Sequence, residues 1–302
     1  MAAEGINLQS ASGRSGIKLT EDMVLISTDC VCDLTKELKQ RYEIPIMFYY
    51  VHTEEARFQD IREMTSDDLI EYIEGQDKKA YSSCASVEEY QAFFEQQRKM
   101  TNAPIIHICM AQYVSEAYHT AREAAREMEQ VYVVDSGHLS GGMGIMVLTA
   151  ADMAKRGAPC QMILEEIERI RDKISSSFVV ESVDCLYRNG RIGKKVAGLC
   201  DMFSLHPILK LSHSHMGPAG LCVGSQKRFA RAYLRWALRR REEIVPDVVF
   251  LITAGCSYEF QQFLKQEIKK RMPFRTIVVN KASATISCNC GSGAFGVLFL
   301  RH

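Results

Sequence analysis

The chain has 302 residues, of which 47% are hydrophobic, so it is long enough to bury a substantial core and to form two domains. Lys and Arg together number 37, as do Asp and Glu, and this balance does not favour nucleic acid or a membrane surface as a partner. The longest apolar runs, such as residues 248–252, are far too short to span a bilayer.

The first half of the chain alternates short apolar runs with amphipathic segments, as a parallel α/β sheet does. Thr65 and Ser86 each stand before acidic residues, as helix N-caps do, and Ser86 with Glu89 has the pattern of a capping box. Apolar strand-like runs lie at 23–28, 44–51, 104–110 and 131–135, and helices are predicted at 34–42, 65–72, 86–98, 115–129, 141–157 and 160–174.

The second half has a different order of elements. Strands are predicted at 178–180, 209–211, 221–223, 248–253 and 276–279, and two long helices are predicted at 226–241 and 257–271. We interpret helix 160–174 as the link between an N-terminal domain, residues 23–173, and a C-terminal domain, residues 174–302. Residues 1–22 are polar and lack the apolar run of a signal peptide, so we interpret them as a loosely held tail.

The strands of the predicted parallel sheet end on small polar residues rather than on a charged catalytic set. Ligands of such sheets bind at the carboxyl ends of the strands. Neutral hydroxyls suit the holding of a polar head group better than they suit catalysis, so the pattern favours a binding protein. The residues at these strand ends are Thr28, Asp29 and Cys30, then Gln112 and Ser115, then Asp135 and Ser136.

Residues 291–296 read G-x-G-x-x-G but do not predict a dinucleotide site. That fingerprint requires a following helix and an acidic residue about 20 positions further on. Here residues 297–300 predict a strand, and the sequence ends at His302. The sequence also contains no P-loop, no G-x-S-x-G elbow and no H-E-x-x-H motif.

Two alternative functions remain open at this point. A hydrolase or phosphotransferase could use Asp29, Asp135 and His138, although the aspartates more simply cap the segments that follow them and His138 is more simply a satisfied loop residue. A thiol- or metal-responsive regulator could use two C-x-C pairs, although free cysteine is commonly a small buried apolar residue. The two pairs are Cys30 with Cys32 and Cys288 with Cys290.

The eleven cysteines are spread over the chain without the spacing of a secreted disulfide framework. Reduced thiols and a cytoplasmic location are therefore expected. A basic stripe at helical spacing, with aromatic residues on a different face, predicts a solvated surface or a docking surface for an acidic partner. The stripe is Arg228, Arg231, Arg235 and Arg239, and the aromatic residues are Phe229, Tyr233 and Trp236.

The same segments, taken in order, resemble the motifs of the DegV family from about residue 23 to the C-terminus. The matching segments are Thr28-Asp29-Cys30 (T-D-S), residues 58–60 (Y-x-D), 82–86 (T-S-Q-P-S), 114–121 (L-S-G-T-Y-Q-S-A), Asp135-Ser136 with Gly141, Gly142 and Gly144 (D-S…G-x-G), 186–192 (Y-L-x-x-G-G-R-I), 206–209 (K-P-I-L) and 291–293 (H-x-G-P-G).

The resemblance implies a two-domain α/β fold, with a parallel-sheet N-terminal domain and a mixed-sheet C-terminal domain. It implies that one long-chain fatty acid, such as palmitate, stearate or oleate, binds in a tunnel in the cleft between the domains. It further implies a carrier that presents the carboxylate to an ATP-dependent fatty acid kinase, and that holds no cofactor or metal and catalyses nothing itself. We expect a monomer or weak dimer.

The resemblance also implies the site residues. The fatty-acid carboxylate is expected at Ser82, Ser83, Gln112, Ser115 and Asn289, the pocket loops are expected to include Thr28, Asp29, Cys30, Gly291 and Gly293, and the kinase is expected to dock at Arg188 and Arg191.

Four positions depart from the family pattern. The loop threonine of the family corresponds to Ser82, and the serine of T-D-S corresponds to Cys30. The second carboxylate-binding serine falls where this chain has Ala111 and Gln112, and the closing histidine corresponds to Asn289. Asparagine donates hydrogen bonds but carries no positive charge, so the head-group site is altered while the apolar pocket is expected to persist.

Overall fold

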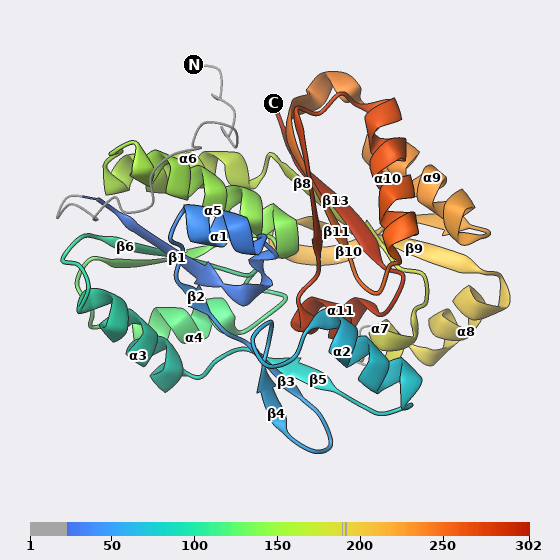
Figure 1. Cartoon of the computed structure of the whole chain (residues 1–302), viewed down its shortest axis with the longest axis horizontal. Coiled ribbons are helices and arrows are strands. Elements are labelled where there is room, and N and C mark those ends of the chain that lie inside the picture. Colours follow the sequence, from blue (N-terminus) through green and yellow to red (C-terminus); the bar gives the residue numbers. More distant parts are fainter. Residues whose placement is uncertain (1–22, 189, 191) are drawn as a thin grey trace.

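The computed structural model describes residues 23–188, 190 and 192–302. These residues form three sheets with helices packed around them (Figure 1). The strand orders are β2-β1-β6-β7, β10-β9-β8-β13-β11-β12 and β4-β3-β5. Within this part of the chain, no helix is both long enough and apolar enough to cross a membrane.

The first sheet is entirely parallel, as the alternating pattern predicts. Every residue of its two central strands is buried, because helices cover both faces of a parallel sheet. Its strands are β1 (Leu25–Asp29), β2 (Ile46–Met47), β6 (Ile105–Cys109) and β7 (Val131–Asp135), and its helices are α1 (Lys36–Arg41), α3 (Val87–Arg98), α4 (Ala117–Ala124), α5 (Ser140–Lys155) and α6 (Cys160–Arg171).

Both predicted helix starts are confirmed. The Ser86 hydroxyl accepts a hydrogen bond from the Glu89 amide, and the Glu89 carboxylate accepts one from the Ser86 amide. Thr65 and Asp68 make the same reciprocal pair at the start of α2 (Ser66–Ile70). The helix continues past Ile70 as a π-helical turn, Glu71–Gly75.

The six-stranded sheet is mixed. β11 pairs with β12 in parallel, and every other neighbouring pair is antiparallel. The aromatic face of α9 (Gln226–Ala237) is buried as predicted and packs with α10 (Tyr258–Arg271) over one face of this sheet. The strands are β8 (Ile174–Val179), β9 (Leu205–Ser212), β10 (His215–Val223), β11 (Ile244–Thr253), β12 (Thr276–Lys281) and β13 (Phe295–Arg301).

Helix α5 lies between the two large sheets and contacts β1 and β6 on one side and β8, β11 and β13 on the other. Its glycines permit this double contact. A Cβ atom on Gly142 would lie 2.1 Å from the Ser176 Oγ, and one on Gly144 would lie 2.8 Å from the Cys32 carbonyl oxygen. These distances are too short for any side chain, so the glycine-rich sequence sets how closely the helix approaches each sheet.

The small third sheet and three helices were not predicted from the sequence. The apolar run at 44–51 divides between β2 and β3, which belong to different sheets. Elements of three to nine residues show too little periodicity to be recognised. These elements are β3 (Tyr50–His52), β4 (Arg57–Gln59), β5 (Tyr81–Ser83), α7 (Asp184–Arg188), α8 (Lys194–Met202) and α11 (Ala284–Cys290).

The α/β fold class, with a parallel sheet followed by a mixed sheet, is confirmed. The boundary predicted near residue 173 falls between α6 and β8, where the chain leaves the parallel sheet and enters the mixed sheet. The division into two domains stays a prediction.

Candidate ligand-binding cavity

A cavity of about 480 Å³ is lined by residues from both halves of the chain. Its lining is mostly apolar, and four sequence-predicted residues, Ser82, Ser83, Ser115 and Asn289, are part of it. Their positions at β5, before α4 and in α11 are brought together only by the fold. The larger apolar side chains are Met110, Val114, Leu139, Phe178, Leu186, Leu211, Met216, Ile252, Ile286, Phe295 and Leu298.

Helix α11 brings Asn289 to the cavity. The Ser283 hydroxyl caps this helix by accepting from the Ile286 amide. The buried Asp60 carboxylate accepts from the amides of Ala284 and Thr285 at 2.8 and 2.9 Å. Backbone donors at a helix start favour a carboxylate, so Asp60 holds this end of α11 in place.

In the last turn of α11, the Asn289 Nδ2 donates to the Ser82 Oγ at 3.2 Å and to the Thr285 carbonyl at 2.9 Å. Because the Ser82 oxygen accepts this bond, its own proton remains available to a ligand. Successive residues of a strand point to opposite faces, so Ser83 lies on the other face of β5 from Ser82, and there it also lines the cavity. The Ser83 Oγ lies 2.8 Å from the His52 Nε2.

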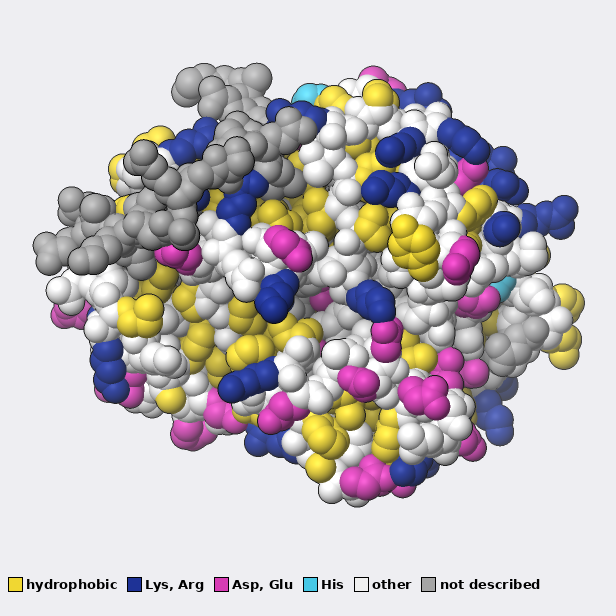
Figure 2. Space-filling model, in the orientation of Figure 1, with side chains coloured by type: hydrophobic (Ala, Val, Ile, Leu, Met, Phe, Trp, Pro, Cys, Tyr) yellow, Lys and Arg dark blue, Asp and Glu magenta, His cyan; other side chains and the backbone are white. Residues whose placement is uncertain are grey.

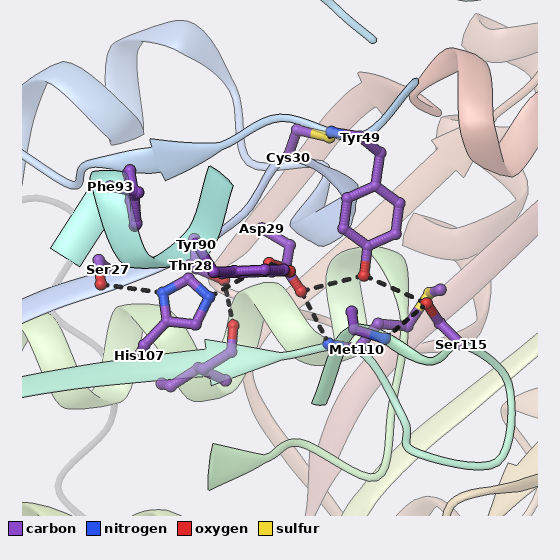
Figure 3. Close-up of polar contacts among 12 residues, drawn as sticks. Ser27, Thr28, Asp29, Cys30, Tyr49, Tyr90, Phe93, His107, Met110 and Ser115 are labelled. Carbon is purple, nitrogen blue, oxygen red and sulfur yellow. Dashed lines mark hydrogen bonds and ion pairs between the residues drawn. The ribbon is translucent and has the colours of Figure 1, made fainter. Parts of the chain in front are cut away.

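Behind the cavity, Asp29 is completely buried at the centre of a polar network (Figure 3). Its carboxylate accepts from the hydroxyls of Tyr90 and Tyr49 at 2.7 and 3.1 Å. It also lies 3.2 Å from both the Met110 amide nitrogen and the His107 Nε2. Burial first, and then the charge of Asp29, raises the pKa of both tyrosines, so both keep their protons and act as donors.

The Asp29 network reaches the cavity through Tyr49, whose hydroxyl lies 3.4 Å from the Ser115 Oγ. Since the one proton of Tyr49 is given to Asp29, Ser115 cannot receive it. The Ser115 oxygen accepts from the Ala117 amide at 3.2 Å, and its own proton is therefore directed to Tyr49 or to the cavity. When a hydrogen-bond acceptor of a ligand lies within reach in the cavity, Ser115 can donate this proton to it.

The interpretation of Asp29 as a cap is wrong. Asp29 stands at the N-cap position of the 3₁₀ turn Cys30–Cys32, but its side chain makes no capping bond. The sequence did not reveal its partners Tyr49, Tyr90 and His107. One feature of the sequence pointed to a buried polar network at this place. His107 is the one imidazole in an otherwise apolar strand, and a buried imidazole requires hydrogen-bond partners. Its Nδ1 is paired with the Ser27 Oγ at 3.0 Å.

Six other residues predicted for the ligand site do not line this cavity: Gln112, Thr28, Asp29, Cys30, Gly291 and Gly293. The Thr28 hydroxyl donates to the Ile108 carbonyl, and the backbone N–H of Gln112 donates to the Asp135 carboxylate. Gly293 has a φ of +74°, and a Cβ atom there would lie 1.8 Å from the Glu181 Oε2, so only glycine fits this turn. Their roles toward a ligand stay predictions.

The residues of the alternative enzymatic reading are engaged by other parts of the protein. Asp135 accepts from the Ser214 hydroxyl and from the backbone N–H groups of Gln112 and Gly137. The His138 ring bridges the Ser176 Oγ and the Arg171 carbonyl. Burial lowers the pKa of His138, which favours the neutral ring. Neither residue lines the cavity, nor does Asp29.

The four cysteines of the C-x-C pairs are buried thiols. Burial raises the pKa of Cys32 and of Cys288 to about 12, which keeps both protonated. Among the described residues, one group of His, Cys and acidic side chains has its potential ligand atoms within 4.8 Å of one another, and it is Asp29, His107 and Cys109. The C-x-C cysteines do not form such a group in this part of the chain.

The two candidate docking surfaces differ in how their arginines are paired. The Arg188 Nη2 lies 3.6 Å from the Asp77 Oδ1, and both side chains are well exposed. Arg191 lies outside the described residues. In the stripe, the Arg231 Nε lies 3.6 Å from the nearly buried Glu267 carboxylate. Figure 2 shows Lys and Arg side chains gathered over the region of α9 and α10.

The model of the DegV family, described as an uncharacterised protein family, matches residues 23–302. A DegV domain-containing protein of Deinococcus radiodurans is 27% identical over 278 residues, which cover 91% of this chain and 97% of that protein. One of Staphylococcus aureus is 23% identical over 282 residues, which cover 92% of this chain and 98% of that protein.

Solved structures agree with this match. A DegV family protein of Thermus thermophilus, described by its fatty acid binding, has a TM-score of 0.80 at 24% identity and covers 93% of this chain and 100% of its own. One of Eubacterium eligens loaded with heptadecanoic acid has a TM-score of 0.79 at 18% identity and covers 92% of this chain and 100% of its own. With its fold and nearly its full length matched, the chain belongs to the DegV family.

Proposed function

We propose that the protein binds one long-chain fatty acid in the cavity and presents its carboxylate to an ATP-dependent fatty acid kinase, without catalysing a reaction itself. The observation that supports this most directly is the composition of the cavity wall. Apolar side chains from the six-stranded sheet, from the loops beyond the parallel sheet and from α11 surround most of the space, and neutral hydroxyl and amide donors occupy β5, the loop before α4 and α11. The relatives described as fatty acid binding share this fold.

The apolar wall supplies the affinity. A 16-carbon acid has about 14 methylene groups, and burial at about 0.8 kcal/mol each gives on the order of 11 kcal/mol before the costs of association. The cavity volume of about 480 Å³ lies in the range of roughly 300–1,000 Å³ that is usual for small-molecule sites. The donors then fix which end of the molecule lies at Asn289.

The head group is held by neutral donors, namely the hydroxyls of Ser82, Ser83 and Ser115 and the amide of Asn289, with Gln112 as a further predicted donor. Removal of one hydrogen bond to a charged group costs roughly 1.5–3 kcal/mol. We therefore expect Ser82→Ala and Asn289→Ala each to weaken binding of a fluorescent fatty acid by about tenfold or more. If neither variant weakens binding by as much as about threefold, the head group lies elsewhere.

Native mass spectrometry of the purified protein tests the binding function. We expect an added mass equal to one long-chain fatty acid, such as palmitate, stearate or oleate, and Met216→Trp should remove it, because Met216 lines the cavity. Met202→Trp is the matched control, since Met202 is 74% exposed and lies outside the lining. A bound metal ion in place of the acid, or an acid that remains bound in Met216→Trp, would contradict the proposed site.

The kinase is proposed to dock at Arg188 and Arg191 rather than at the stripe. Arg188 lies on α7, two residues after the lining residue Leu186, whereas no residue of α9, which carries most of the stripe, lines the cavity. In a reconstituted assay of acyl-phosphate formation, Arg188→Glu and Arg191→Glu should lower turnover while lipid binding persists. Arg231→Glu/Arg235→Glu is the control, and loss of turnover in that variant alone would move the docking surface to the stripe.

A further inference from the structure

The imidazole of His52 lies directly behind one cavity hydroxyl. His52 and Ser83 are on neighbouring strands of the small sheet, and the His52 Nε2 is 2.8 Å from the Ser83 Oγ. The His52 ring also stacks on Tyr81, with 4.5 Å between ring centroids and 1° between the planes. The stacking and the hydrogen bond fix both the plane of the ring and the nitrogen that faces Ser83.

His52 is a source of positive charge one hydrogen bond away from the cavity. Of the described residues that line the cavity, none is Lys, Arg or His, and one, Glu116, is acidic. An anionic head group in this lining therefore meets no opposite charge directly. Burial of an unpaired charge is costly, so a proton delivered to a nearby group would offset part of that cost.

The protonation state of His52 determines where the Ser83 proton points. When the neutral ring carries its proton on Nδ1, its Nε2 accepts the hydroxyl hydrogen of Ser83, which turns the donor away from the cavity. A protonated ring donates from Nε2 to the Ser83 oxygen, which leaves the hydroxyl hydrogen free to point into the cavity. The same step places a positive charge behind the hydroxyl and strengthens its bond to an anion.

The groups around His52 hold the ring neutral when the cavity is empty. Burial first, and then the nearby Arg57 guanidinium, lowers the pKa of His52 below 6.5. Arg57 is itself paired with Glu89 at 3.0 Å and lies over the Tyr50 ring. Tyr81, whose ring stacks on His52, lies on β5, the strand that pairs with the other edge of β3.

We propose that His52 is a positioning residue for an anionic head group, because its protonation turns the Ser83 hydroxyl into the cavity, so that the anion and one proton bind together. This inference rests on the proposed lipid-binding function and names the chemistry of its head-group end. It assigns to His52, on β3, the positive charge that Asn289, on α11, does not have.

The proposal makes binding of an anion dependent on pH. Anion binding favours the charged ring, so affinity rises as pH falls from above the pKa of His52 in the complex to below its pKa in the empty protein. Fatty acids titrate near the same range and are unsuitable as the probe. Dodecyl sulfonate keeps its charge throughout, and dodecanol is neutral throughout, so the pair separates the effect of the protein from that of the ligand.

Isothermal titration of the protein with each compound, measured from pH 8 to pH 5.5 with no fatty acid present, tests the inference. For the wild-type protein, we expect sulfonate affinity to rise by at least about threefold and dodecanol affinity to stay constant. His52→Gln should remove the pH dependence, because a glutamine amide donates to Ser83 at every pH. His213→Gln is the matched control, since His213 is exposed in the turn between β9 and β10 and should leave the profile unchanged.

A second measurement does not require a variant. The NMR titration of the His52 ring should show its pKa raised when dodecyl sulfonate is bound and unchanged when dodecanol is bound. If His52→Gln keeps the wild-type pH profile, or if the ring titrates identically with both compounds, His52 has only a structural role. If the wild-type protein binds neither compound at any pH, it is the proposed lipid-binding function that fails.

Discussion

The two sides of the cavity are held in place by different kinds of contact around buried carboxylates. On the side of the parallel sheet, Asp29 is contacted mainly by side chains, namely two phenols and an imidazole. On the side of α11, Asp33 and Asp60 accept from backbone amides at the start of the helix. Side-chain contacts can be removed one at a time, whereas backbone contacts hold α11 as a unit.

The carboxylates at the start of α11 also have altered pKa values. Burial raises the pKa of Asp33 to about 7, even though Ser140 and Ser283 donate hydrogen bonds that lower it. Burial also raises the pKa of Asp60. The comparison therefore teaches that α11 is held by two carboxylates whose pKa burial raises, next to backbone donors at the start of the helix.

The largest expected effect comes from the Asp29 side. Asp29→Ala leaves the buried donors of Tyr49, Tyr90 and His107 without their acceptor, so we expect a loss of roughly 3–5 kcal/mol in the free energy of unfolding. Urea denaturation at pH 7 measures this loss. Asp77→Ala is the control, because its side chain is 91% exposed and 3.6 Å from Arg188. A loss of under about 1 kcal/mol for Asp29→Ala would show that the network is not cooperative.

A smaller effect is expected from Asp33→Asn, and it depends on pH. The unfolded chain releases this proton near pH 3.8, whereas the folded protein keeps it to about pH 7. Between these values the folded state binds more protons, so this group lowers the free energy of unfolding as pH rises from about 4 to about 7. Asparagine should remove that component, whose ceiling is about 4 kcal/mol. Unfolding curves of both proteins that keep parallel pH profiles would contradict the raised pKa.

The smallest effect is expected from Asn289→His, which restores the residue found in the family pattern. A protonated imidazole donates a charge-assisted hydrogen bond to a carboxylate, so fatty-acid binding should be kept or tightened by a few-fold at pH 6. Asn289→Gln is the neutral control, and both affinities can be read from the same fluorescent titration. A marked loss of affinity for Asn289→His at pH 6 would show that this position does not face the head group.

The sequence predicted the parts of the fold that have local signals. Alternating apolar runs identified the long strands, and the reciprocal pattern of Ser86 and Glu89 identified a helix start that the structure confirms. It did not predict α11, whose seven residues have no helical periodicity and include a C-x-C pair. The order of the family motifs nevertheless pointed to Asn289 and Ser82, which the fold brings within 3.2 Å of one another.

The partners of the buried acids could not be predicted, because they are distant in the sequence. Asp29 meets His107 across 78 positions, and Asp60 meets the start of α11 across 224. Neither contact has a local pattern, and both depend on the register of strands and on the packing of helices. The sequence therefore indicated strand ends near the cavity, but not which of their side chains line it, as Ser115 does, and which lie behind it, as Asp29 does.

The glycines of α5 have a consequence for the cavity wall. Gly142 and Gly144 leave no room for a side chain between the helix and its neighbours, because a Cβ atom would meet the Ser176 side chain or the Cys32 carbonyl. Ser176, on β8, is itself part of the cavity wall. Substitutions in the lining can thus change the space one side chain at a time, whereas a larger residue at Gly142 would press α5 against β8 and move a part of the cavity wall as a unit.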